Sequence, residues 1–123
     1  MKLDPDCVRD IMTYIEENHD YGNCLMFMWG MDIVIKNYSE DEVLNTVEYL
    51  VAKSYLRDNG IDNGYLITGI LPDGYEFLAN TRKSSVWDET KTTLKEKGVE
   101  GAIDIMGKVA KKIVEKKLGI DLS

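Results

Sequence analysis

Apolar side chains near the start of the chain recur at helical spacing. Asp4 precedes Pro5, and this order is typical of a helix start, with the aspartate as N-cap and the proline at the first helical position. Four apolar residues then follow at positions i, i+3, i+4 and i+7, which share one helical face: Val8, Ile11, Met12 and Ile15. The pattern predicts an amphipathic helix of about three to four turns that ends near Asn18.

The next apolar segment has a different pattern. Residues 24–29 are continuously apolar, and residues 32–36 are short and β-branched. Both features are typical of strands, with Gly30 at a turn or bulge between them. The polar residues 19–23 form the preceding loop. We therefore predict two short strands after the first helix.

A capping box marks the start of the second helix. Ser39 and Glu42 are three residues apart, so that each side chain reaches the backbone N–H of the other. Tyr38 and Val43 stand at the positions of a hydrophobic staple. Apolar residues continue on one helical face, and we predict a helix of about four turns over residues 40–54.

A β-hairpin is predicted after this helix. Residues 55–57 and 65–68 are short strand formers, and they flank a polar loop with two turn signals at residues 58–64. A further helix is predicted from Pro72, which suits a first helical position. Its predicted core positions, with the two residues that extend the apolar set, are Tyr75, Leu78, Ala79, Val86 and Trp87.

The last part of the chain is predicted to be helical. Residues 87–97 form a polar helix that Gly98 ends. The final helix carries one apolar stripe, which consists of Val99, Ala102, Ile103, Met106, Val109, Ala110, Ile113 and Leu118. Gly107 is its weak point, because glycine lowers helix stability. Five lysines lie off the stripe: Lys108, Lys111, Lys112, Lys116 and Lys117.

The order of these elements is that of a winged helix-turn-helix domain, which is an α+β fold. We expect a winged-helix-like domain at residues 1–80, with helices and a small β-hairpin wing, and a C-terminal helical extension at residues 81–123. Helix 40–54 would be the recognition helix and residues 57–64 the wing. The chain departs from that fold at Leu71, where many winged helices have a capping threonine. The segment before the capped helix also lacks the pattern of a second helix.

Four segments of the chain together resemble a known family: residues 3–11, 38–43, 67–80 and 82–87. The family consists of uncharacterised proteins from Gram-positive bacteria and their phages, and it is known only as a domain of unknown function. The resemblance extends over residues 1 to about 97, in order and with sensible spacing. It implies a phage or mobile-element setting, and it supplies no catalytic residues.

Length and composition indicate one soluble domain. With 123 residues, 44% hydrophobic and 30% charged, the chain is too short for two independent domains and too apolar for disorder. No run approaches the roughly 18 apolar residues of a membrane span, and the acidic residues after Met1 are unlike a secretory signal. We therefore expect a cytoplasmic protein.

Charge is distributed unevenly along the chain. Residues 1–79 carry five basic and fifteen acidic side chains, whereas residues 80–123 carry ten basic and seven acidic ones. The acidic body repels phosphate backbones over about a Debye length, which disfavours contact with DNA. The same surface would suit a mimic of DNA that occupies a basic groove, although charge alone is weak support for that hypothesis.

The sequence contains no recognisable catalytic, cofactor or metal site. Cys7, Cys24 and His19 lack the spacing of zinc ligands, and we expect reduced thiols and a solvated histidine. Neighbouring carboxylates such as Glu16 and Glu17 are more often surface charges than an acid and base pair. We expect a protein that is not an enzyme and that binds neither a cofactor nor a metal.

The protein is expected to act through contacts with other proteins and with copies of itself. The aromatic and methionine cluster is mostly core by default, because uninterrupted apolar strands are buried, and it consists of Met26, Phe27, Met28, Trp29 and Met31. A domain of this size cannot easily hide both that run and the stripe of the last helix, so some of this surface would meet another copy or an unidentified partner. The expected seam of a homodimer consists of Val99, Ile103, Met106, Val109, Ala110 and Ile113. The alternative is a last helix that folds back onto its own body.

The alternative function is a DNA-binding transcriptional regulator that uses helix 40–54 and the wing at residues 57–64. The basic tail would supply affinity. The residues expected to contact DNA are Asn45, Thr46, Arg57, Lys108, Lys111 and Lys112. Carboxylates outnumber basic groups on helix 40–54, so the acidic body disfavours this function.

Overall fold

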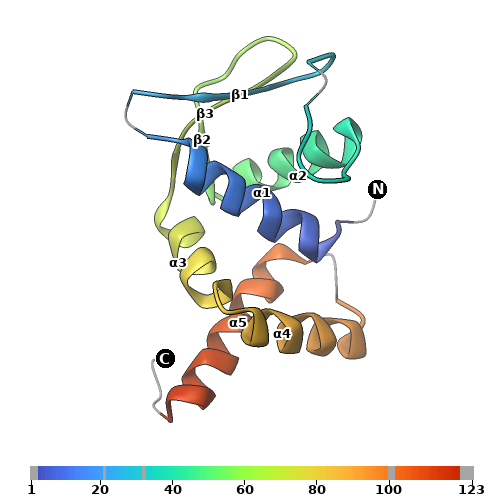
Figure 1. Cartoon of the computed structure of the whole chain (residues 1–123), viewed down its shortest axis with the longest axis vertical. Helices are drawn as coiled ribbons and strands as arrows, with labels where there is room; N and C mark the ends of the chain where they lie inside the picture. The colour runs from blue at the N-terminus through green and yellow to red at the C-terminus, as the bar shows by residue number, and fades with distance from the viewer. Residues whose placement is uncertain (1–2, 21, 32, 100–101, 120–123) are drawn as a thin grey trace.

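The computed structural model describes residues 3–20, 22–31, 33–99 and 102–119, and in them the chain has the predicted α+β class. The elements in these residues are α1 (Pro5–Asn18), β1 (Leu25–Met28), α2 (Glu40–Ala52), β2 (Leu56–Asp58), β3 (Gly64–Ile70), α3 (Pro72–Thr81), α4 (Ser84–Lys97) and α5 (Ile103–Leu118). Figure 1 shows the strands at one end of the molecule and the pair α4 and α5 at the other. None of the described helices has the length and hydropathy that crossing a membrane requires.

Helix boundaries follow the capping signals in the sequence. The Asp4 carboxylate accepts a hydrogen bond from the Asp6 N–H at 2.9 Å, at the start of α1. Ser39 and Glu42 form the predicted capping box of α2. Gly98 has a left-handed backbone conformation and ends α4. These three predictions are confirmed.

The three strands form an antiparallel sheet in the order β1-β3-β2. Phe27 of β1 pairs with Tyr65 of β3, and Leu56 of β2 pairs with Ile70 of β3. The predicted hairpin, here β2 and β3, is confirmed, and its register shifts just after Arg57. Since β3 is central, β1 and β2 are the two edge strands.

The predicted strand at residues 32–36 is wrong. Its first residue lies outside the described part of the chain, and the others form no strand. Ile35 is buried, and the Tyr38 hydroxyl donates to the Asp10 carboxylate of α1 at 2.7 Å. Lys36, with a φ of 52°, turns the chain between these two anchors. The segment is attached to α1 instead of pairing with a sheet edge.

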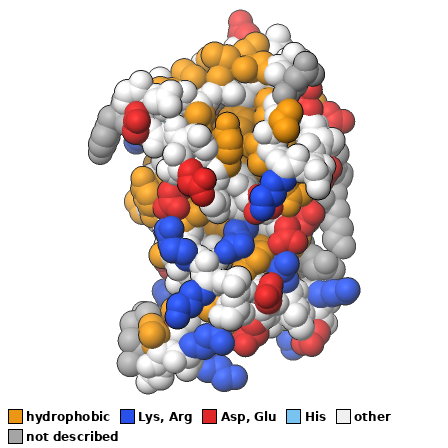
Figure 2. Space-filling model, viewed as in Figure 1, with side chains coloured by type: hydrophobic (Ala, Val, Ile, Leu, Met, Phe, Trp, Pro, Cys, Tyr) orange, Lys and Arg blue, Asp and Glu red, His pale blue; other side chains and the backbone are white. Residues whose placement is uncertain are grey.

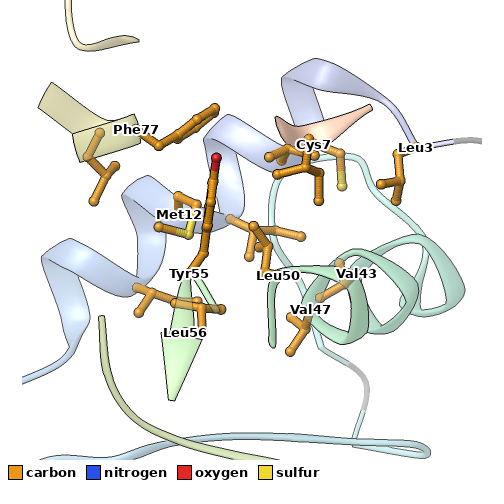
Figure 3. Packing of buried hydrophobic residues seen from close by; sticks show 14 of the residues in the cluster. Leu3, Cys7, Met12, Val43, Val47, Leu50, Tyr55, Leu56 and Phe77 are labelled. Atoms are coloured by element: carbon orange, nitrogen blue, oxygen red, sulfur yellow. The ribbon is translucent and has the colours of Figure 1, made fainter. Parts of the chain in front are cut away.

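The hydrophobic core joins the N-terminal and C-terminal elements. One buried cluster contains residues of the sheet and of all the described helices, and Figure 3 shows part of it. Phe77 of α3 packs on Tyr55 and on Trp87, with ring centroids 5.6 and 6.1 Å away. The Trp87 indole N–H donates to the Asp6 carboxylate of α1 at 2.9 Å. The C-terminal helices therefore share one core with the elements before them.

The buried face of α3 differs from the predicted one. Tyr75 is 52% exposed and Ala79 also faces solvent, whereas Phe77 and Leu78 are buried. The predicted core position Leu78 is confirmed, and Tyr75 and Ala79 are wrong, because the packing of the Phe77 ring sets the rotation of the helix. Leu71 supplies no side-chain cap to α3, as its apolar side chain predicts.

The final helix packs on its own chain. Its buried stripe residues are Ile103, Met106, Ala110 and Ile113. Their contacts are mainly with α3 and α4. A Cβ atom at Gly107 would lie 3.0 Å from the Tyr55 hydroxyl, so the absence of a side chain there lets α5 approach closely. This arrangement is the one expected for a last helix that folds back onto its own body.

Candidate functional site

Large apolar side chains from the segment around β1 are exposed. They are Met26 (46%), Trp29 (53%), Met31 (47%) and Val34 (79%), which we call the β1 face. Figure 2 shows hydrophobic side chains gathered at the end of the molecule where the strands lie. The interpretation of this run as mostly core therefore holds for Phe27, whereas Met26, Trp29 and Met31 are exposed.

The sheet explains which members of this run are exposed. Successive side chains of a strand point to opposite faces, and Phe27, between two methionines, is only 2% exposed. Helix α2 packs on the sheet on that inner side. Met26 points to the other face, which is open to solvent. An uninterrupted apolar strand is buried on both sides only where both faces of its sheet are covered.

Backbone hydrogen bonds hold the turn after β1 in place. The Trp29 N–H donates to the Asn63 carbonyl in the hairpin tip at 3.3 Å. The Gly30 N–H donates to the Glu40 carboxylate at the start of α2. Gly30 has a φ of 84°, a conformation that glycine adopts without strain. The β1 face is therefore fixed between the hairpin and α2 before any partner binds.

Carboxylates lie beside the β1 face. We call them the acidic rim, and they are Glu40 and Asp41 at the start of α2 and Asp62 in the hairpin tip. Glu40 bonds to the turn at Gly30, and Asp62 directly precedes the residue that binds the Trp29 N–H. The hairpin tip and the N-terminus of α2 thus carry negative charge on two sides of the exposed apolar residues.

Two further carboxylates, Glu48 and Asp58, act on the other face of the sheet. Burial raises the pKa of Tyr65, and the charges of Glu48 and Asp58 raise it further. Tyr65 pairs with Phe27 of β1. Directly opposed residues of an antiparallel pair share one face of the sheet, so Glu48 and Asp58 act on the covered face with Phe27 and not on the face of Met26.

The residues of α2 and the wing that were expected to contact DNA are mostly buried or bonded to other residues of the chain. Thr46 is buried, and its hydroxyl lies 3.5 Å from the Cys7 sulfur. Asn45 is half-buried, and among the described residues its amide nitrogen has no hydrogen-bond partner. The Arg57 guanidinium donates to the Thr68 hydroxyl at 3.2 Å. Thr46 faces the core and not a duplex.

The lysines expected to contact DNA lie on another part of the molecule. Lys108 and Lys112 are exposed on α5, and Lys111 is half-buried beside Glu76 of α3, at 3.7 Å. Figure 2 shows basic side chains over the half of the molecule that contains α4 and α5. The structure therefore does not bring these lysines together with Asn45 and Arg57.

The residues of the expected dimer seam are largely covered within the chain. Ile103, Met106, Ala110 and Ile113 are buried, and Val99 and Val109 are half-buried. A seam through all six would require α5 to leave α3 and α4. The seam thus remains a prediction that this arrangement of α5 does not favour.

A groove between α4 and α5 was missed by sequence reasoning. It has a volume of about 480 Å³ and an apolar floor of Ile105, Val109 and Ile113. The lysines along it are Lys108, Lys112 and Lys116, and Glu89 and Thr93 border it on α4. The sequence signal for this groove was a lysine at every fourth residue beside an apolar stripe. The sequence does not show which part of the stripe remains exposed, because the packing of α4 decides that.

A second cleft, of about 280 Å³, lies between α3 and α5. Tyr55 lines it and is 6% exposed. Burial raises the pKa of its hydroxyl to about 12, and Asp104, Asp73 and Glu76 add to the shift. Burial likewise raises the pKa of the Cys7 thiol to about 11. Both groups stay protonated at neutral pH, so neither is poised as a base or nucleophile.

The cysteines and the histidine lie apart. Cys7 is buried and Cys24 is exposed, and both are free thiols. The His19 ring nitrogen Nε2 lies 2.9 Å from the Thr68 carbonyl, within hydrogen-bond distance, and the residue is half-buried. The expected solvated histidine is therefore only partly exposed to solvent. Within the described ranges no cluster of three or more ligand-type side chains is arranged for a metal ion.

Comparisons with known proteins identify relatives without an assigned activity. A family model described as "Hypothetical protein (DUF2513)" matches residues 2–100, from α1 through α4. An uncharacterized protein of Haemophilus influenzae (strain ATCC 51907 / DSM 11121 / KW20 / Rd) is 26% identical over 121 residues, which cover 96% of this chain and 99% of the relative. No solved structure matches the chain.

Proposed function

The chain belongs to the DUF2513 family of hypothetical proteins, and we propose that it is a non-enzymatic protein-binding module that docks a basic partner on its β1 face. One observation carries this proposal: four large apolar side chains, close together in sequence in and just after the edge strand β1, are 46 to 79% exposed. Exposed apolar clusters of this kind, rimmed by polar residues, mark sites of protein contact.

The chemistry of the β1 face favours a protein partner. Tryptophan and methionine are enriched in interface cores, where they supply large contact areas. Methionine is also unbranched and flexible, so it adapts to more than one partner shape. The hydrogen bonds at Trp29 and Gly30 fix the backbone of the turn, which lowers the entropy cost of binding.

The acidic rim specifies the charge of the partner. Carboxylates around an apolar centre repel acidic proteins and accelerate encounter with basic ones. We therefore expect a partner with apolar side chains surrounded by lysine or arginine. Association should be slower at high salt, because the rim charges are exposed and screened.

The scaffold we propose is winged-helix-like and carries a C-terminal helical extension. The support is the order of α1, β1, α2, β2 and β3, together with the position of β3 between the other strands. The resemblance of the sequence to phage proteins of Gram-positive bacteria suggests a cytoplasmic role linked to a phage or mobile element. In this proposal the scaffold presents a surface for protein contacts, and it has no catalytic site.

Site-specific photo-crosslinking in host cells tests the proposal. A photoreactive residue replaces Met31 or Val34 on the β1 face, or Tyr75 on α3 as a control. Tyr75 is a matched control, because it is 52% exposed and apolar but belongs to another surface. We expect discrete adducts from positions 31 and 34 and none from position 75. Equal adducts at all three positions, or none at 31 and 34, would overturn the proposal.

A DNA-binding regulator is the second candidate function. Its support is the element order of a winged helix and the basic side chains of α5. Helix α2, however, carries exposed carboxylates at Asp41 and Glu48, which disfavour contact with a phosphate backbone. This candidate requires DNA affinity that falls steeply with salt and depends on Arg57.

A further inference from the structure

We propose that the groove between α4 and α5 binds the β1 face of a second copy of the chain, so that copies associate head to tail. This inference rests on the proposed function, because it names one basic partner that the β1 face accepts. It differs from the expected seam, since it leaves α5 docked on its own body.

The groove has the features that the partner of the β1 face requires. Its floor of Ile105, Val109 and Ile113 is apolar, and Lys108, Lys112 and Lys116 stand along it. Its volume of about 480 Å³ is within the range of about 300–1,000 Å³ that is typical of sites for compact ligands. If a tryptophan or methionine of the β1 face of one copy contacted this floor in another copy, the carboxylates near that side chain would lie beside the lysines of the groove.

The charges of the two surfaces are complementary. Three carboxylates form the acidic rim, whereas three lysines and one carboxylate, Glu89, line the groove, where Lys112 also lies 3.8 Å from Glu115. Glu89 itself lies 3.9 Å from Lys117, so part of its charge is offset. Attraction between unlike surfaces favours this orientation, and repulsion between two acidic rims disfavours contact between two β1 faces.

The placement of the two surfaces makes the contact intermolecular. Figure 1 shows the strands and the α4–α5 pair at opposite ends of the molecule, so one copy does not close its β1 face onto its own groove. Figure 2 shows basic side chains concentrated at the α4–α5 end, with acidic ones among them. A contact between two different surfaces leaves one of each free, and therefore extends into rings or chains.

The size of the surfaces predicts weak association. A stable interface buries about 800 Å² on each partner, roughly a tenth of the surface of a small protein. The total accessible surface of this chain is 7234 Å², and four side chains of the β1 face contribute only part of such an area. We expect dissociation constants on the order of 10–100 µM at low salt, and about tenfold weaker binding at high salt.

Sedimentation velocity of the purified chain is the first experiment. The protein is measured over a concentration series at about 50 mM and about 500 mM NaCl, which changes screening several-fold. We expect the average mass to rise with concentration at low salt and to return to that of a monomer at high salt. A monomer at every concentration and salt would overturn the inference.

Two variants then separate head-to-tail contact from symmetric contact. Trp29→Glu removes the β1 face and keeps the groove, whereas the double variant Lys108→Glu/Lys116→Glu does the reverse. Each variant alone is expected to be monomeric. An equal mixture is expected to form a dimer and nothing larger, because only one intact surface of each kind remains.

Matched controls exclude trivial effects of the substitutions. Tyr75→Glu inserts the same charge at an equally exposed aromatic residue, and Lys95→Glu/Lys97→Glu makes the same charge change on α4 outside the groove. Both controls are expected to associate like the unmodified chain, and thermal unfolding of all variants checks that they are folded. The inference fails if Tyr75→Glu is as monomeric as Trp29→Glu, or if Lys95→Glu/Lys97→Glu is as monomeric as Lys108→Glu/Lys116→Glu. In either case general charge, and not the groove, would control association.

The remaining outcomes distinguish this inference from the proposed function. Association that survives Lys108→Glu/Lys116→Glu would assign the contact to two β1 faces and overturn the head-to-tail geometry. A mixture of folded variants that stays monomeric would also overturn the head-to-tail geometry. A chain that never self-associates but binds a DNA duplex through the groove would assign the lysines to nucleic acid. In each of these cases crosslinks from Met31 to another protein would still support the proposed function.

Discussion

At the scale of single residues, Gly74 determines how closely α3 approaches the backbone just before β2 and the end of β3. A Cβ atom there would overlap the Tyr55 carbonyl oxygen and lie 2.8 Å from a methyl group of Ile70. Helix propensity alone predicts that Gly74→Ala stabilises the chain by about 1 kcal/mol. We expect the opposite, a loss of about 1–3 kcal/mol in the free energy of unfolding, because the site is already filled.

Urea denaturation measures this loss, and Gly22→Ala is the control. A Cβ atom at Gly22 meets only the Asp20 carboxylate, at 3.8 Å, which is an ordinary contact. We expect the control to change stability by less than about 0.5 kcal/mol. A Gly74→Ala variant as stable as the control would mean that α3 moves aside without cost.

Asp6 makes stability depend on pH. Burial raises the pKa of its carboxyl, but hydrogen bonds from Trp87 and Lys91, with the charges of Lys91 and Arg9, outweigh burial and lower the pKa below its ordinary value. A lowered pKa stabilises the folded state above the unfolded pKa of about 3.9, and this contribution is lost as pH falls through the folded value. Because the pair is partly exposed, we expect Asp6→Asn to cost only about 1 kcal/mol at pH 7.

Denaturation curves at several pH values check the sign. The difference between the unmodified chain and Asp6→Asn should shrink as pH falls below about 4, where the carboxyl becomes neutral in both states. Asp88→Asn is the control, since Asp88 lies 4.0 Å from the same Lys91 amine but is mostly exposed. A difference that is constant with pH would show that Asp6 acts through geometry and not through charge.

At the scale of elements, the two helices α2 and α3 differ in how their first turns are satisfied. Ser39 accepts from the Glu42 N–H at 3.1 Å, whereas Leu71 at the start of α3 makes no side-chain hydrogen bond. We expect Ser39→Ala to destabilise the chain by about 1 kcal/mol, measured by urea denaturation. Ser39→Asp is a control that restores an acceptor at the same position, and it should recover most of the loss.

The docking of α5 gives a second prediction at this scale. Ile103 is 3% exposed and Leu118 is 60% exposed, although both belong to the apolar stripe seen in the sequence. Ile103→Asp buries a charge without a partner, and we expect it to cost about 3 kcal/mol or more in thermal or urea unfolding. Leu118→Asp should change stability by less than about 0.5 kcal/mol. Equal effects would mean that α5 is not docked as described.

The elements themselves were largely predictable from the sequence, because their signals are local. The capping box at Ser39, the proline at the start of α1 and the turn residues of the hairpin each act within a few residues. The exposure of Trp29 and the burial of Ile103 were not predictable in the same way. Both depend on which faces other elements cover, and residues far apart in the sequence decide that.

At the scale of the whole molecule, the separation of charge limits how the chain could meet DNA. The acidic rim lies at the end where a recognition helix and wing would act, and the lysines of α5 lie at the other end. A duplex could therefore be held only through the lysines. Contacts between three of these lysines and DNA phosphates give weak, non-specific binding. The logarithm of the binding constant then falls with the logarithm of the salt concentration at a slope of about -3.

Fluorescence anisotropy of a random-sequence duplex measures that slope. We expect weak binding at about 50 mM salt that disappears by about 200 mM, and no binding by the Lys108→Glu/Lys116→Glu variant. Arg57→Ala should leave the titration unchanged, because the Arg57 guanidinium is bonded to Thr68 on the sheet. Tight binding with a slope several times steeper, lost in Arg57→Ala, would require the duplex to reach the wing despite the acidic rim. The regulator would then replace the protein-binding module as the better account of this fold.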